Sequence, residues 1–140
     1  MILTPDDNLK IIDFEGCGMD GAQAKSCYEG FSYRRSVPST SKQTDIFAFG
    51  CAAYEIITGK PPYHELEKLD GNSSLVEQRY EQNQFPNVFD LPLGALMRSC
   101  WQGEAKSMAD IRRQLEAFSP SDRRKKRFLV ESDKCFSALD

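Results

Sequence analysis

Residues 44–63 read TDIFAFGCAAYEIITGKPPY and give the clearest structural signal in the chain. Its apolar residues recur at steps of three and four, the spacing that places side chains on one face of an α-helix. Other apolar residues fall between those positions, so the helix is apolar on nearly all sides and is expected in the middle of a domain. Gly59 marks its end, because glycine readily takes the left-handed conformation that closes a helix. The sequence therefore predicts a central buried helix over residues 44–58.

A β-hairpin and a long loop are predicted before this helix. Residues 1–4 and 9–13 are short apolar runs separated by a Pro-Asp-Asp-Asn cluster, which is typical of a tight turn. Residues 14–41 are rich in Gly, Ser and Arg and show no period, which predicts a loop with a short helical piece at 22–28. Loops of that length usually carry function.

Three shorter helices are predicted after the central one. Residues 60–73 are polar and read as a surface loop, and a capping box then opens an exposed helix over 74–84. Apolar residues in 93–101 trace one face of the next helix. A second capping box at 107–110 precedes an apolar stripe over 108–118. The expected fold class is mainly α, a small helical bundle fed by one hairpin.

Composition narrows the function classes. The 140 residues are 40% hydrophobic and 28% charged, enough for one core, and the net charge of −3 gives no strong field for nucleic acid or an acidic membrane. The five cysteines are scattered without a C-x-x-C pair, which predicts reduced thiols inside a cell and no zinc site. No apolar run reaches the length of a membrane span. A cytoplasmic location is expected, and the basic run at 123–127 also fits nuclear import.

Three matches, in order, resemble the protein kinases of eukaryotic type. Residues 9–16 (LKIIDFEG) resemble the strand and Asp-Phe-Gly motif of that family. The stretch 44–63 is similar to the central helix of the kinase large lobe and to the loop after it. Cys100-Trp101, followed by an amphipathic helix, is similar to the last helices of the lobe.

The resemblance covers most of the chain. Order and spacing agree over residues 1–118, which implies a partial kinase domain there, the C-terminal or large lobe, followed by a flexible basic tail at 119–140. The resemblance implies that the intact parent uses Mg²⁺ and ATP to phosphorylate a Ser, Thr or Tyr hydroxyl of a protein. A protein substrate or a regulatory protein is the expected partner.

The resemblance also implies roles for individual residues. Asp13 would hold Mg²⁺ between the phosphates of ATP, with Phe14 packed beneath it and Glu15 and Gly16 as its motif neighbours. By residue type alone, Asp13 is also an aspartate that ends a hairpin and caps a turn. Glu15 stands where the family has glycine, which removes the freedom to take positive φ and adds a carboxylate beside the presumed metal site.

Three further residues invite a functional interpretation. Asp45 would accept hydrogen bonds from the catalytic loop in the family, and it also complements the helix dipole as a plain N-terminal acid. Trp101 lies on an apolar face and is expected in the core rather than in a ligand-stacking site. His64 has neither triad nor metal partners nearby in the sequence and is predicted at the surface.

Several parts of the kinase machinery are not found in these 140 residues. The glycine-rich cover, the small-lobe lysine, the catalytic Asp and its metal-binding Asn are absent from the sequence, so no catalytic residue is identified and the isolated chain is expected to be inactive. The Ala-Pro-Glu motif is not recognisable, and residues 31–35 (FSYRR) occupy its region. Lys106 is the base nearest to the arginine that normally pairs with that glutamate.

Two rival interpretations stay open. Residues 16–21 spell G-x-G-x-x-G after a strand, the phosphate-binding fingerprint of Rossmann-like dinucleotide-binding proteins, although the expected helix, second strand and ribose-binding acid do not follow. The altered Asp-Phe-Glu motif alternatively favours a non-catalytic, pseudokinase-like docking or scaffold module. A phosphate on a hydroxyl within residues 26–41 could bond to Arg34 and Arg35 and order the loop.

Overall fold

In the computed structural model, the described residues are 2–6, 8–10, 18, 21–22, 30–35, 40–69 and 71–118. They contain a two-stranded sheet, four α-helices and two short 3-10 helices, which confirms the mainly helical fold class. Four predicted features lie wholly or mostly outside this set: the Asp13–Gly16 motif, the glycine pattern at 16–21, the helical piece at 22–28 and the basic tail at 119–140.

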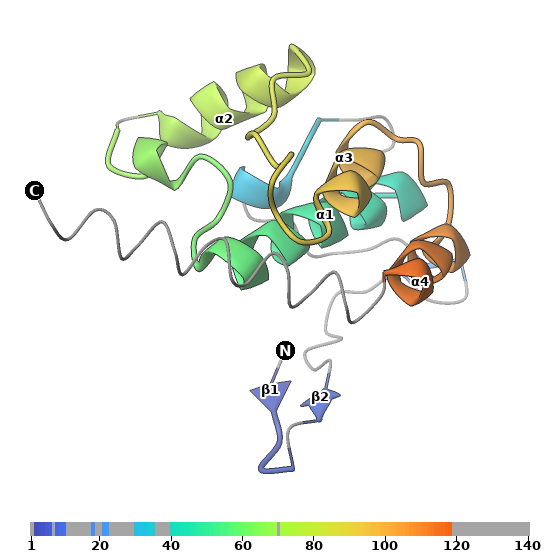
Figure 1. Ribbon diagram of the computed structural model, residues 1–140. Helices are drawn as coiled ribbons and strands as arrows, with labels where there is room; N and C mark the ends of the chain where they lie inside the picture. The colour runs from blue at the N-terminus through green and yellow to red at the C-terminus, as the bar shows by residue number, and fades with distance from the viewer. Residues whose placement is uncertain are drawn as a thin grey trace, which may run out of the picture.

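The predicted hairpin is present. Strands β1 (Ile2–Leu3) and β2 (Leu9–Lys10) pair antiparallel, with Ile2 opposite Lys10. The turn is closed by the amide of Thr4, which donates to the carbonyl of Asn8 at 2.9 Å. Figure 1 shows the hairpin at one side of the helical body, and the chain between them runs through residues outside the described set.

The central helix α1 (Lys42–Thr58) begins two residues before the predicted start. Ser41 caps it: its hydroxyl accepts from the amide of Thr44 at 3.2 Å, and the Thr44 hydroxyl accepts from the amide of Ser41 at 2.7 Å. This reciprocal capping box uses threonine where glutamate or glutamine is usual, so the sequence pattern is easy to miss. Gly59 ends the helix at φ 77°, as predicted.

Helix α1 is buried along its middle part and exposed at both ends. Ile46, Phe47, Cys51 and Ala53 are all less than 9% exposed, as expected of a central helix. Ile56 is the exception among the positions predicted to be buried, because its side chain is 71% exposed near the C-terminal end. The expectation of burial on all sides is therefore wrong for the last turn.

Helix α3 (Gly94–Trp101) packs across α1 at very short range (Figure 1). A Cβ atom at Gly50 would lie 2.8 Å from the Cβ of Cys100 and 3.0 Å from the Nε1 of Trp101. Real Cβ atoms do not approach other atoms that closely, so only glycine allows this crossing without displacement. A single glycine in α1 therefore sets how near the two helices lie.

Gly94 starts α3 in an even tighter place. A Cβ there would lie 1.9 Å from the carbonyl oxygen of Val88, in the loop that precedes the helix. Val88 is itself 1% exposed, so its backbone is packed on all sides and cannot easily shift away from residue 94. The loop can pack this closely against the start of α3 only because residue 94 is glycine and has no Cβ atom.

Helix α2 (Asn72–Glu81) corrects two predictions. It begins two residues before residue 74 and its N-cap is Gly71 in the left-handed conformation, so the predicted capping box does not form. It is also not a wholly exposed helix, because Val76 and Tyr80 are both 0% exposed. The loop before it is not simple surface either: it contains the 3-10 helix η2 (His64–Leu66), and its buried residues are Pro62, Tyr63 and Leu66.

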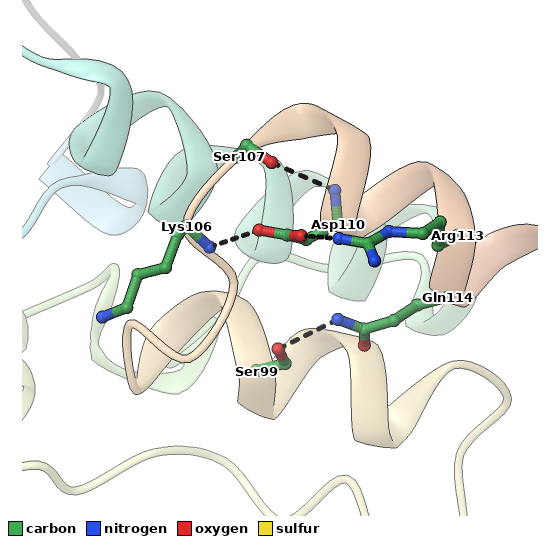
Figure 2. A network of polar contacts seen from close by, with 6 residues as sticks. All are labelled: Ser99, Lys106, Ser107, Asp110, Arg113 and Gln114. Carbon is green, nitrogen blue, oxygen red and sulfur yellow. Dashed lines mark hydrogen bonds and ion pairs between the residues drawn. The ribbon is translucent and has the colours of Figure 1, made fainter.

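Helix α4 (Met108–Ala117) is capped as predicted by Ser107, whose hydroxyl accepts from the amide of Asp110 at 3.2 Å. Figure 2 shows how the Asp110 carboxylate turns back to accept from the amide of Lys106 at 2.9 Å and also meets Arg113. Ile111 is buried, but Met108 is 53% exposed, so the predicted apolar stripe is wrong at its first residue. The cap, rather than Met108, secures the start of the helix.

Candidate functional site

The residues predicted to hold Mg²⁺ and ATP are not among the described residues. Asp13, Phe14, Glu15 and Gly16 all lie in the interval 11–17, for which the structure gives no geometry. Within the described ranges, no three His, Cys, Asp or Glu side chains gather closely enough to hold a metal ion. Metal binding by Asp13, and its closeness to α1, therefore stay predictions.

Asp45 lies in the first turn of α1 and is exposed. A carboxylate at this place complements the positive end of the helix dipole. Its family role requires a catalytic loop that these 140 residues do not contain. The placement of Asp45 fits a plain N-terminal acid of the helix, and its contact with a catalytic loop stays a prediction.

Trp101 is a core residue, as predicted. It is 1% exposed, and its ring stacks on Phe85 with centroids 5.6 Å apart and planes 13° apart. Tyr54 packs against it from α1 at a centroid distance of 5.9 Å. Among the described residues its indole N–H has no hydrogen-bond partner. Because the ring is 1% exposed and packed against Phe85 and Tyr54, it offers no open face on which a ligand could stack.

Residues 30–35 include the 3-10 helix η1 (Gly30–Ser32) and make side-chain contacts with distant parts of the chain; they are called here the 30–35 segment. By the kinase resemblance it ends the substrate-facing loop, in the place of the unrecognisable Ala-Pro-Glu motif. Arg34 donates to the side-chain oxygen of Asn83 at 3.2 Å, and Arg35 pairs with Glu77 at 3.1 Å. Both partners lie in or just after α2, so this helix holds the segment in place.

Tyr80 provides the buried contact between α2 and the 30–35 segment. Its hydroxyl donates to the carbonyl of Phe31 at 2.7 Å and lies 3.9 Å from the sulfur of Cys51. The backbone also comes close, since a Cβ at Gly30 would lie 2.7 Å from the hydroxyl oxygen of Ser73. The sequence interpretation missed this role of α2; the available signal was the apolar pair Val76 and Tyr80, one helical turn apart.

Burial raises the pKa values of both groups of this contact, which are protonated at pH 7 even at their ordinary values. It raises the pKa of Tyr80 far above the ordinary value, and the adjacent Cys51 adds to the shift. It also raises the pKa of Cys51 to about 12, against a smaller opposite effect of the bond to Tyr80. Tyr80 is therefore a neutral hydrogen-bond donor at pH 7, and Cys51 is a packing residue rather than a nucleophile.

Lys106 does not replace the missing arginine of the family. Its Nζ donates to the carbonyl of Gly103 at 2.5 Å, within its own loop, and no carboxylate of the described residues pairs with it. Neither member of the family's ion pair is left as a buried, unpaired charge, which is the arrangement that would cost most stability.

His64 lies at the surface as predicted. Its side chain is 40% exposed, and Nδ1 lies 3.6 Å from a carboxylate oxygen of the neighbouring Glu65. Such a pair between adjacent exposed residues has no third group to orient it, so it gives no triad.

None of the helices in the described ranges combines the length and the apolarity that a membrane crossing requires.

Comparison with known proteins supports the resemblance. The model of a family described as protein tyrosine and serine/threonine kinase matches residues 28–118. The chain is 30% identical over 97 residues to a mitogen-activated protein kinase kinase kinase of Drosophila melanogaster, covering 61% of this chain and 8% of that protein. It is 26% identical over 125 residues to mitogen-activated protein kinase kinase kinase 10 of Mus musculus, covering 83% of this chain and 13% of that protein. No solved structure matches.

The match spans the parts that the structure describes best. It runs from just before the 30–35 segment to the end of α4 and takes in more than half of the chain. Within the described residues the two strands pair antiparallel, and the parallel βαβ unit of a Rossmann fold is not among the elements. The chain belongs to the protein tyrosine and serine/threonine kinase family.

Proposed function

We propose that this chain forms part of the large lobe of a protein kinase whose intact form transfers the γ-phosphate of ATP to a protein hydroxyl. The observation that carries the proposal is the docking of the 30–35 segment between α1 and α2. Phosphoryl transfer depends mainly on positioning and charge neutralisation, so a lobe that fixes its substrate-facing segment supplies part of the catalysis.

The proposed division of labour follows from what the chain contains. Helix α1 is the platform, the 30–35 segment faces the substrate, and Asp13 is the proposed ligand of Mg²⁺. The metal, when bound with ATP, neutralises phosphate charge. One metal ligand supplies little of the stabilisation that the reaction needs, so the isolated chain is proposed to be inactive.

The proposed partners are proteins inside a cell. Both named relatives are kinases of another kinase, which favours a protein hydroxyl as the phosphate acceptor. The chain spans 8% and 13% of the length of these curated relatives, so activity belongs to the larger protein. Choice between Ser/Thr and Tyr is set by residues of the catalytic loop, which is not in this sequence.

A chimeric kinase tests the proposal. Residues 1–118 would replace the matching segment of the mouse relative, and transfer of labelled phosphate from ATP to a protein substrate would be measured. We expect the chimera to be active, the 140-residue chain alone to be inactive, and Asp13→Asn to lower the chimera's rate at least about 100-fold. Asp6→Asn, an exposed acid in the hairpin turn, is the matched control and should leave the rate unchanged.

A scaffold function is the second candidate, and Glu15 is the observation that favours it. A carboxylate in place of glycine restricts the backbone and adds negative charge beside the proposed metal ligand. An inactive chimera that regains activity with Glu15→Gly would show that the natural chain is a binding module. Activity of the chimera with Glu15 in place would exclude that interpretation.

A further inference from the structure

One face of α2 lies against the 30–35 segment. It is formed by residues four and three positions apart, the spacing of a single helical face: Ser73, Glu77 and Tyr80. The Ser73 hydroxyl oxygen lies 2.7 Å from where a Cβ atom of Gly30 would be, so the start of the helix touches the start of the segment. The other two residues bind the segment through a charge pair and a hydrogen bond. The contacts therefore run along most of the helix.

The two bonded contacts hold opposite ends of the segment. Tyr80 binds the carbonyl of Phe31 near its beginning, in a neutral and buried bond. Glu77 pairs with Arg35 at its end, where the glutamate side chain is 23% exposed and the arginine side chain 71% exposed. An exposed pair of this kind contributes little to the stability of a fold. A second contact, four residues from the first, nevertheless fixes the direction of the segment as well as its distance from α2.

We propose that Glu77 is a positioning residue for the protein substrate, because its pair with Arg35 keeps the end of the 30–35 segment docked on α2. This inference rests on the proposed kinase function, in which the segment faces the substrate. The predicted ligands of Mg²⁺ and ATP lie at residues 13–16 and not on α2. Glu77 thus acts on the reaction through the segment and not through the reacting atoms.

A positioning role has a kinetic signature. When the segment is docked in a fraction of the molecules, the apparent affinity for the substrate is reduced by that fraction. Once the substrate is bound, the segment is in place and the chemical step proceeds as before. Loss of the pair should therefore raise KM and leave kcat unchanged. A merely structural role would instead reduce the amount of active enzyme and lower kcat.

Charge reversal in the chimera described above tests this role. We expect Glu77→Arg, which sets two positive charges against each other, to raise KM for the protein substrate at least about threefold and to leave kcat within about twofold. Adding Arg35→Glu restores the pair with opposite polarity and should return KM to within about twofold of the wild-type value. Glu81→Arg, the same charge change at an exposed position at the end of α2, is the matched control and should change neither constant.

Hydrogen exchange distinguishes failure of this inference from failure of the proposed function. In the 140-residue chain, Glu77→Arg should speed amide exchange in residues 30–35, and the double variant should restore the wild-type rate. Glu77→Gln, which keeps the size of the side chain, should give a smaller change in the same direction; circular dichroism would check that each variant is folded.

Three outcomes would overturn the positioning role while leaving the kinase function intact. These are unchanged exchange in the folded variants, faster exchange with an unchanged KM in an active chimera, and a lower kcat with an unchanged KM. Inactivity of the wild-type chimera would overturn the proposed function and, with it, the role assigned to Glu77.

Discussion

Tyr80 joins two segments that are 49 positions apart in the sequence, through the bond from its hydroxyl to the carbonyl of Phe31. The residue is 0% exposed, so its hydroxyl has no water as a substitute partner, while Phe31 is partly buried. A carbonyl that loses its donor without a replacement bears its desolvation penalty. This single hydroxyl is thus a measurable link between α2 and the 30–35 segment.

Replacing Tyr80 by phenylalanine should release the 30–35 segment. We expect Tyr80→Phe to lower the free energy of unfolding by about 1–3 kcal/mol and to speed amide hydrogen exchange in residues 30–35. Tyr63→Phe is the matched control, because it removes a hydroxyl that donates to the carbonyl of Gln84 at 2.6 Å. It should cost stability without faster exchange in that segment; equal exchange in both variants would contradict the link.

The contact at Gly50 makes a second prediction for a single residue. Alanine is the better helix former by about 0.5–1 kcal/mol, yet its Cβ would overlap Cys100 and Trp101. Overpacking of that kind costs about 1–3 kcal/mol, so we expect Gly50→Ala to be destabilising in urea unfolding. A rise in stability would mean that α1 and α3 separate easily, against the close packing described here.

The positions of the helices could be predicted from the sequence more reliably than which face of each helix is buried. The period of α1 and the stop at Gly59 depend on neighbouring residues, so both could be predicted. Burial of α2 depends instead on the 30–35 segment and on the loop at 60–66, which approach from other parts of the chain. A local sequence pattern does not show which distant residues will pack against a helix. For the same reason the contact of Tyr80 with Phe31 could not be predicted from the sequence.

The cap of α4 should make stability depend on acidity. The pKa of Asp110 is lowered, first by the bond from the amide of Lys106 and then by Ser107. A lowered pKa in the folded state means that the stabilisation is present above the ordinary carboxyl value of 3.8 and is lost as the pH falls below it. We expect Asp110→Asn to lower Tm at pH 7 and to match the wild type more closely near pH 2.

The control for this prediction is Glu116→Gln, on the same helix. Glu116 pairs with Arg112 at 2.7 Å, and both side chains are exposed, so the pair contributes little. Its Tm difference from the wild type should be small at both pH values. A difference for Asp110→Asn that does not change between pH 7 and pH 2 would show that the carboxylate charge is not what stabilises the cap.

At the scale of the whole molecule, the core is asymmetric. Aromatic rings fill the space between α1, α2 and the loop after residue 84, where Phe47, Tyr80, Phe85 and Trp101 contact one another. Ile56 lies 71% exposed on α1, whereas the next residue, Ile57, packs against the core. The end of α1 therefore presents apolar surface outward.

This asymmetry predicts how the isolated chain behaves. We expect the wild-type chain to aggregate or to bind hydrophobic dyes, and Ile56→Lys to reduce both, since it removes exposed apolar surface. Ile57→Lys should instead unfold the chain, because it places a charge against the core. Light scattering and circular dichroism would distinguish the two; a wild-type chain that neither scatters light nor binds dye would contradict the expectation.

Gly94 has a consequence for any survey of natural or artificial variants. With the Val88 carbonyl 1.9 Å from where a first side-chain atom would sit, every substitution meets the same obstacle, whatever its polarity or size. A saturation library selected for folded protein should consequently return a single amino acid at this position, alanine being rejected as firmly as tryptophan. Nearby exposed positions such as Phe89 should tolerate many different amino acids in the same library.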